Sequence, residues 1–253
     1  MRNDFACSLN GLQFNLLDDL LYIQDIEEQI KMGVETAKRP YYGSFLVGTP
    51  GHDSLAVTIT FMVKQCDRAA RQAIIQKVNG WAKEGWLTVS TRPGQQLYVV
   101  CTQPANTKAF EWSDDLSVVF TAYQESYWQD VEGVTDSGSG TSVDLSLTPS
   151  GTRPCCLCAE ITSTENTIDT LTISTVRGMM RFEGLSLAPQ SVLTIGYNER
   201  HLLYVTADGL SKLACRTGQS SDDLWLEPNI SNAISIVADG AFSAVITAKG
   251  EYD

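Results

Sequence analysis

Hydrophobic and polar residues alternate along much of the first half of the chain, and a period of two is typical of a half-buried β-strand. The clearest run is 55–63, in which Leu, Val, Ile, Phe and Val occupy every second position. Similar runs predict strands at 86–91, 97–102 and 116–122. The Arg-Pro-Gly sequence at 92–94 predicts a hairpin turn between the first two of these. Leu12, Phe14 and Leu16 also alternate near the start of the chain.

One segment follows a helical period instead. Its apolar residues recur at spacings of three and four, at Ala70, Ile74, Val78, Trp81 and Ala82. Asp67 stands where an N-cap is expected, and Gly85 is a candidate C-cap. The pattern predicts a helix from Asp67 to about Lys83 that packs on the sheet formed by the neighbouring strands.

Residues 33–54 are rich in Gly, Pro and Tyr and show no clear period, so they predict either a long loop or a loose β-arm. Four large side chains in this segment have no pattern that would bury them: Arg39, Tyr41, Tyr42 and Phe45. Tyr and Arg are favoured anchors in protein interfaces. These four residues are therefore the candidate oligomer-interface residues.

The second half of the chain has a different sequence pattern. Residues 131–142 are dense in Gly, Ser and Thr, which is typical of a linker. Beyond them, short alternating segments recur without a helical stripe, and Asp208-Gly209 and Asp239-Gly240 are two-residue hairpin signals. This regular spacing predicts a β-sandwich.

The fold class is therefore mainly β with some α. We expect an N-terminal α+β domain at 1–130, with an antiparallel sheet and one helix. We expect a linker at 131–142 and a β-sandwich domain at 143–253.

Acidic residues outnumber basic ones by 30 to 18, which gives a net charge of −12 and argues against specific or tight nucleic-acid binding. No apolar window is long enough for a membrane helix, so no membrane insertion is expected. The first residues lack a signal-peptide pattern. The seven cysteines are odd in number and irregular in spacing, so reduced thiols are expected. Cys155, Cys156 and Cys158 lie in a predicted strand and indicate structural thiols rather than a metal site.

No arrangement of residues indicates catalysis. Only two histidines occur, His52 and His201, and neither lies near a recognisable nucleophile motif. Adjacent acids occur as four pairs: Asp18-Asp19, Glu27-Glu28, Asp114-Asp115 and Asp222-Asp223. Neighbours in an extended chain point to opposite sides, so these pairs do not form the dyad of a glycosidase. The sequence therefore predicts no enzyme, no catalytic residue, no cofactor and no metal.

Aromatic residues leave one binding hypothesis open. A cluster exposed on the sandwich could stack on sugar rings, although aromatic residues in β-proteins more often lie in the core. The candidates are Trp112, Tyr123, Tyr127, Trp128, Tyr197, Tyr204 and Trp225. The alternative function is thus a non-enzymatic protein with a carbohydrate-binding β-sandwich module.

The ordered set of these patterns resembles the distal tail proteins of long-tailed (siphovirus-type) bacteriophages over nearly the whole chain. In the first half, the resemblance rests on Leu9-Asn10-Gly11, on the strand at 55–61, on the helix and returning strand at 68–87, and on 116–120 with Tyr123 and Tyr127. In the second half it rests on Arg181-Phe182-x-Gly184-Leu185, Leu193-x-Ile195 and 223–236. The cysteine cluster, and Pro228-Asn229 in place of Pro-Gly, depart from the family pattern.

The resemblance implies a virion structural protein of the tail tip or baseplate, assembled in the host cytoplasm. Six copies would form a ring through the first domain, and this homo-hexamer would join the tail tube protein to the tail-tip hub. The second domain would be a galectin-like sandwich that holds receptor-binding proteins or touches cell-surface glycans.

Overall fold

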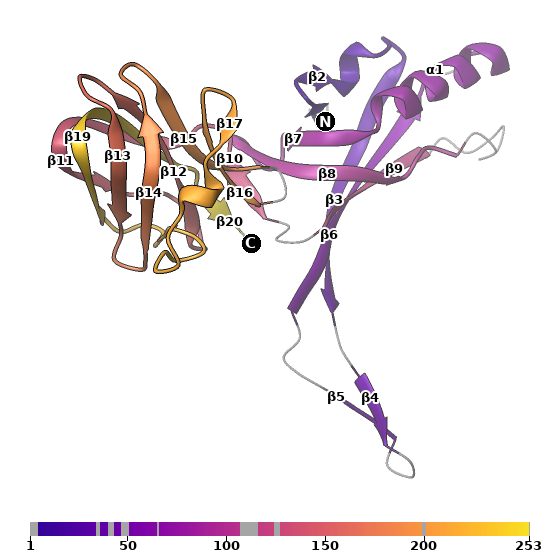
Figure 1. The fold of residues 1–253 in the computed structure, drawn as a ribbon. Coiled ribbons are helices and arrows are strands. Elements are labelled where there is room, and N and C mark those ends of the chain that lie inside the picture. The colour runs from indigo at the N-terminus through magenta and orange to yellow at the C-terminus, as the bar shows by residue number, and fades with distance from the viewer. Residues whose placement is uncertain are drawn as a thin grey trace. The chain divides into compact units, whose positions relative to one another are not determined.

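The computed structural model describes residues 5–33, 36–39, 43–46, 51–64, 66–106, 116–123, 127–198 and 201–252. Of the residues between 31 and 53 it describes the backbone alone. The chain divides into two compact units, Met1–Trp128 and Gln129–Asp253. Antiparallel strands dominate both units, and the helix α1 (Arg68–Trp81) belongs to the first (Figure 1). The predicted fold class is confirmed.

The first unit is built on one antiparallel sheet, and helix α1 follows strand β6 (Gly51–Val63) along the chain. Its strands run in the order β2 (Leu12–Gln13), β1 (Cys7–Leu9), β7 (Glu84–Val89), β8 (Gln95–Gln103), β9 (Leu116–Tyr123), β6 (Gly51–Val63) and β3 (Leu21–Gly33). The predicted strands at 55–63, 86–91, 97–102 and 116–122 all lie in this sheet. The turn at 92–94 joins β7 to β8 as a hairpin, as predicted.

Helix α1 begins where the sequence predicted. The Asp67 carboxylate accepts a hydrogen bond from the Ala70 backbone N–H at 2.8 Å and so caps the first turn. One face of the helix, which includes Ile74, Val78 and Trp81, is buried. Gly80 lowers the intrinsic stability of the helix, and burial of this face offsets that loss.

The helix ends close to the predicted position, but Gly85 is not its C-cap. The helix ends at Trp81, and Gly85 lies inside β7 instead of capping it. A Cβ at Gly85 would stand 2.2 Å from the Asn10 side chain. Asn10 is held there because its amide oxygen accepts the Trp86 N–H at 2.9 Å and its amide donates to the Glu84 carbonyl at 3.3 Å. Glycine is therefore needed for close approach of Asn10 to β7.

Four aromatic rings form the centre of the first core. Trp81 packs edge-to-face on Phe14 and Phe120, with ring centroids 5.2 and 5.7 Å apart, and Phe14 packs on Phe61 at 5.2 Å. Phe14 belongs to the short 3-10 helix η1 (Phe14–Leu16), so the alternation of Leu12, Phe14 and Leu16 does not mark one strand. The Trp81 indole donates to the Leu12 carbonyl at 3.0 Å.

The second unit is a sandwich in which one strand pair serves both layers. The main strand path is β14 (Met179–Leu187), β13 (Ile168–Ser174), β19 (Asn232–Ala248), β12 (Cys155–Ser163), β15 (Val192–Tyr197), β16 (Leu203–Ala207) and β17 (Leu210–Ser211). Strand β11 (Val134–Leu147) pairs with β19 along its length, and β18 (Trp225–Leu226) pairs with β12. The short strands β10 (Trp128–Asp130) and β20 (Glu251–Tyr252) pair with each other. The 3-10 helix η2 (Leu213–Cys215) follows β17.

The strand pair β11–β19 bends sharply and passes from one layer to the other. The first half of β19 pairs with β13 and its second half pairs with β12. At the bend, Gly140 faces Phe242 while Ser142 faces Val237, so residues 238–241 oppose Thr141 alone. Strands that switch sheets at bulges form the corners of β-sandwiches.

This corner corrects two predictions. Residues 131–142 are not a linker, because most of them belong to β11; their glycines permit the bend, and a Cβ at Gly138 would lie 2.5 Å from the Val143 side chain. Asp239-Gly240 is not a hairpin turn but the bulge within β19, and the Asp239 carboxylate accepts the N–H groups of Asp169 and Thr170 at 3.1 Å each. Asp208-Gly209 does form the predicted hairpin, between β16 and β17.

Candidate functional site

The segment that carries the candidate interface residues is a β-arm and not a long loop. Strands β3 and β6 pair from Leu21↔Val63 to Gly33↔Gly51, and between them β4 (Thr36–Arg39) and β5 (Gly43–Leu46) form a hairpin (Figure 1). Arg39 pairs with Gly43 and Phe45 with Ala37 through the backbone. The side chains of Arg39 and Phe45, and all of Tyr41 and Tyr42, lie outside the described residues.

Strand β3 forms one end of the sheet of the first unit. It pairs with β6 on one side, and within the described part of the chain no strand pairs with its other side. Tyr22 and Ile30 on this strand are about half exposed, at 45% and 47%. A long edge strand offers unpaired N–H and C=O groups to another chain. Sequence reasoning missed this surface because sheet order depends on pairing between segments far apart in the chain.

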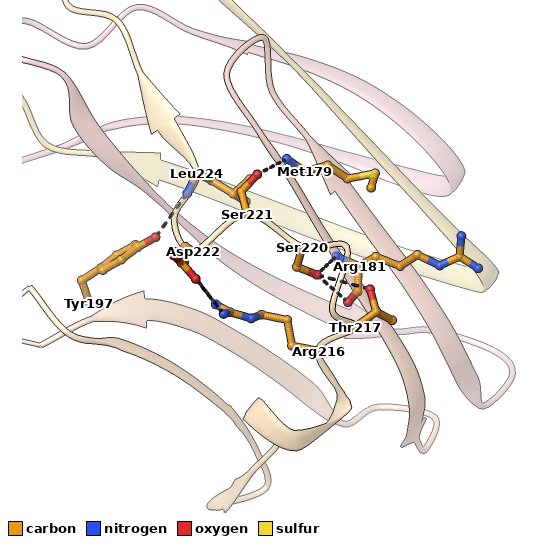
Figure 2. Close-up of polar contacts among 9 residues, drawn as sticks. All are labelled: Met179, Arg181, Tyr197, Arg216, Thr217, Ser220, Ser221, Asp222 and Leu224. Carbon is orange, nitrogen blue, oxygen red and sulfur yellow. Dashed lines mark hydrogen bonds and ion pairs between the residues drawn. The ribbon is translucent and has the colours of Figure 1, made fainter.

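The corresponding edge of the second unit is covered. Figure 2 shows residues 217–221 lying along β14, which ends the strand path of the sandwich. The Ser220 hydroxyl accepts the Arg181 N–H at 2.9 Å and donates to the Arg181 carbonyl at 3.0 Å. The Ser221 hydroxyl accepts the Met179 N–H at 3.1 Å, and the Ser221 N–H donates to the Met179 carbonyl at 2.7 Å. Two serine side chains thus satisfy backbone groups that a neighbouring strand would otherwise satisfy.

Two further contacts hold this covering loop. The Arg216 guanidinium donates to the carbonyl and the carboxylate of Asp222, at 3.1 and 3.2 Å. The Tyr197 hydroxyl accepts the Leu224 N–H at 3.4 Å (Figure 2). Burial raises the pKa of Tyr197, with smaller contributions from Cys156 and Asp223, so its hydroxyl stays protonated at neutral pH. These hydrogen bonds hold the loop against β14, where it blocks the addition of another strand.

The cysteine cluster lies on β12 with the predicted alternation. Cys155 is buried on the inner face, and Cys156 and Cys158 lie on the other face. Burial and the nearby Glu251 raise the pKa of Cys155 to about 12, and burial also raises the pKa of Cys156 and Cys158. These thiols are protonated at neutral pH and are poor nucleophiles. All seven cysteines are free thiols.

Of the two histidines, the structure describes the side chain of His201 alone. His201 Nδ1 lies 3.9 Å from the Glu251 carboxylate, and both side chains are mostly buried. His52 lies on β6, where its side chain is outside the described residues. Within the described part of the chain, no group of three or more His, Cys, Asp or Glu residues could hold a metal ion. No described helix is long and apolar enough to cross a membrane.

The acid pairs have separate structural environments. Three of these acids form ion pairs: Asp18 with Lys77 at 2.9 Å, Glu28 with Arg92, and Asp222 with Arg216. The contact with Lys77 and the Leu20 N–H lower the pKa of Asp18. Asp114 and Asp115 lie outside the described residues.

The aromatic candidates are dispersed between the units. Trp128 is fully buried, and its indole donates to Glu28 at 3.1 Å, so it cannot stack on a ligand. Tyr123 and Tyr127 belong to the first unit, while Tyr197, Tyr204 and Trp225 belong to the second. Tyr204 is 39% exposed on the outer face of the sandwich. Trp112 lies outside the described residues.

Comparison with known proteins shows what fold this is. The chain matches no protein-family profile and no curated protein sequence. Its structure is similar to that of the SPP1 Dit protein (gp 19.1), described as a paradigm of the hub adsorption apparatus in phages that infect Gram-positive bacteria, with a TM-score of 0.66 and 12% sequence identity over 97% of this chain and 98% of that one. It is also similar to a chain of the phage p2 baseplate in its activated conformation, solved with strontium (TM-score 0.53, 7% identity) and with calcium (TM-score 0.53, 8% identity), each over 97% of both chains. The likeness spans both units and confirms the fold that the sequence resemblance implied.

Proposed function

We propose that this chain is a structural protein of a bacteriophage tail tip, a component of the virion that is assembled in the host cytoplasm. The observation that carries this proposal is the shared fold with SPP1 Dit over almost the full length of both chains. A likeness confined to the second unit would fit any protein that contains a common β-sandwich. Here the α+β unit and the sandwich recur together and in the same order.

The finer role is that of an adaptor. Six copies of the first unit form a ring, one face of which binds the tail tube protein and the other the tail-tip hub. The exposed edge of β3 and the arm formed by β4 and β5 support this role, since both offer backbone groups that a second copy can engage. Arg39 belongs to β4 and Phe45 to β5, and Tyr41 and Tyr42 fall between these strands in the sequence; these four are the proposed interface residues.

The second unit is proposed to project from the ring and to hold receptor-binding proteins of the baseplate. Its β14 edge is covered by Ser220 and Ser221. On β11, the Asp136 carboxylate accepts the N–H groups of Ser137 and Ser146 at 2.8 and 2.9 Å. The covered β14 edge disfavours strand pairing between copies there, which supports assembly through the first unit.

A non-enzymatic role fits the chemistry of the described residues. The buried thiols are protonated, His201 faces a carboxylate, and one acid of each described pair forms an ion pair with a basic side chain. We therefore propose that the chain acts by binding partners.

The experiment is the mass of the full chain in solution, measured by sedimentation velocity and native mass spectrometry, with and without the tail tube protein. A hexamer in either sample is expected. Ile30→Lys should weaken assembly because a charge on an edge strand opposes pairing. Val237→Lys is the matched control, since Val237 is 46% exposed but lies on the second unit. Monomer in both samples would refute the ring, and an equal effect of both variants would refute the role of β3.

A further inference from the structure

The covering loop, defined here as residues 212–222, occupies the edge of β14 well beyond the two serines. The Cys215 thiol donates to the Gly184 carbonyl at 3.4 Å, and the Lys212 ammonium donates to the Leu185 carbonyl at 2.8 Å. Side chains therefore satisfy backbone groups along this edge that the backbone of another strand would satisfy in a regular ladder. The edge of β14 is closed by hydrogen bonds from a loop and not by a paired strand.

The backbone groups that the loop occupies are the ones that an added strand would use. The N–H and C=O of Met179 bond to Ser221, and those of Arg181 bond to Ser220 (Figure 2). In an antiparallel ladder, every second residue directs both groups to the same side of its strand. Glu183 therefore belongs to the same outward set as Met179 and Arg181. Removal of the loop would present this set to another chain.

This edge is complementary to a second copy of itself. Arg181 and Glu183 lie on the outer face of β14 as a solvent-exposed ion pair with a distance of 2.9 Å. In an antiparallel pair of two β14 strands with the two-fold axis at Phe182, Arg181 of each copy stands opposite Glu183 of the other. Opposite charges directly across a strand pair are stabilising, and the two-fold axis repeats the contact. Phe182 stays in the core, because its side chain is fully buried.

The contacts that hold the covering loop are individually weak. The ion pair between Arg216 and Asp222 closes the loop on itself, but the Asp222 side chain is 96% exposed. An exposed ion pair adds little to stability, and a hydrogen bond from a serine hydroxyl to the backbone adds a modest amount. A continuous strand that offers its own backbone groups can therefore compete with the loop for β14.

We propose that the covering loop is an autoinhibitory latch, and that its release lets β14 pair with β14 of a second copy in the register that sets Arg181 against Glu183. While the loop is closed, it keeps the second units of different copies from joining at this edge. The proposal goes beyond the proposed function and does not depend on the ring, because the latch lies wholly within the second unit.

The test opens the latch in the full chain by two independent changes. Ser220→Ala with Ser221→Ala removes both hydroxyl groups, and Ser221→Pro also removes the N–H group that donates to Met179. Ser137→Ala with Ser139→Ala is the matched control, since both serines are exposed on β11. Sedimentation velocity measures the mass of each variant against the wild-type chain.

Labelling with iodoacetamide, located by peptide mass, reports on the latch itself. Each lost hydrogen bond shifts the closed–open equilibrium roughly fivefold, so Cys215 should react at least about tenfold faster in both opened variants than in the wild-type chain. Cys155 is fully buried and should stay unlabelled, which shows that the sandwich remains folded. The opened variants should have twice the mass of the wild-type species, and the control should match the wild-type chain in both measurements.

A charge exchange separates the proposed pairing from non-specific aggregation. Arg181→Glu in an opened variant sets two carboxylates against each other and should return the mass to the wild-type value. Addition of Glu183→Arg restores opposite charges across the pair and should restore the doubled mass. An aggregate formed through other surfaces would not follow this order of loss and recovery.

Each contrary result overturns a separate part of the proposal. Unchanged labelling of Cys215 in both opened variants overturns the latch. Fast labelling with the wild-type mass overturns the pairing with a second copy. A doubled mass that ignores the charge exchange, or that the control also shows, places the contact elsewhere and overturns the register. The mass of the wild-type chain reports separately on the proposed ring, because the doubling is measured relative to it.

Discussion

Arg92 forms a bidentate ion pair with Glu28, in which Nε donates to Oε1 at 3.2 Å and Nη2 donates to Oε2 at 3.0 Å. Arg92 lies in the β7–β8 turn, whereas Glu28 lies on β3, which three strand pairings separate from β8. The sheet must therefore curl to bring the two together. The Trp128 indole donates to the same carboxylate at 3.1 Å, and the Arg92 guanidinium lies 5.6 Å from the Trp128 ring centre.

Loss of Glu28 should consequently destabilise the first unit. Glu28→Ala leaves the buried Trp128 N–H without its acceptor, at an expected cost of about 1–3 kcal/mol in the free energy of unfolding. Glu28→Gln keeps an acceptor and should cost less. Urea denaturation followed by circular dichroism measures both, and Asp25→Ala on the same strand is the control for an exposed acid. Equal stability of all three variants would contradict the role of this contact.

Trp81 should be the most sensitive core position of the first unit. Trp81→Ala removes the ring that packs on Phe14 and Phe120 and should cost about 3–5 kcal/mol. Trp81→Phe keeps an aromatic ring but loses the hydrogen bond to Leu12, so it should cost less than Trp81→Ala. If the two substitutions cost the same, the packing of the aromatic ring contributes little.

Deletion of residues 134–142 should prevent the second unit from folding, because it removes the half of β11 that pairs with the end of β19. A true linker would tolerate this deletion. Truncation after Trp128 should instead leave a cooperative fragment. Limited proteolysis and the denaturation midpoint of each product distinguish the two outcomes. A folded sandwich after the deletion would show that β11 is dispensable.

The helix, the first-unit strands and most sandwich strands could be predicted because their periods are local. The exceptions share one cause. Gly-Ser composition is equally compatible with a linker and with a strand that bends at a corner, and only pairing with 232–248 decides between them. Asp208-Gly209 and Asp239-Gly240 are the same dipeptide, yet only the first is a hairpin turn, because β11 continues to pair beyond the second. The packing of Tyr204 on Gly196 could not be predicted, since the register between β15 and β16 is not local.

The stability of the sandwich should fall in acid partly through Asp136. Hydrogen bonds from the Ser146 and Ser137 N–H groups hold the pKa of Asp136 below its usual value. A lowered folded-state pKa means that the ionised carboxylate stabilises the fold above the unfolded-state pKa of about 3.9, and that this contribution is lost as the pH falls through the folded-state pKa. Asp136→Asn should reduce stability at pH 7 and flatten its decline below pH 4. Thermal unfolding from pH 2 to pH 7 measures this, and an unchanged slope in the variant would contradict it.

Cys7 and Cys155 should resist thiol reagents while the chain is folded. Burial raises the pKa of each to about 12, so the reactive thiolate is scarce at pH 8 and the reagent has no access. Titration with a chromogenic disulfide should leave them unreacted in buffer and label all seven cysteines in denaturant. Rapid labelling of Cys155 without denaturant, located by peptide mass, would contradict the packing of β12.

The corner made by β11 and β19 also sets the order in which this protein can mature on the ribosome. Val134 pairs with Ala248, so roughly 6 to 23 seconds separate the synthesis of the two residues, at about 5–20 residues per second. The first unit, which ends at Trp128, can complete its core during that wait. Strand β11 stays unpaired during this time, and its many Gly, Ser, Thr and Asp residues make it less prone to aggregate with other nascent chains. The polar composition that resembles a linker thus protects a strand during translation.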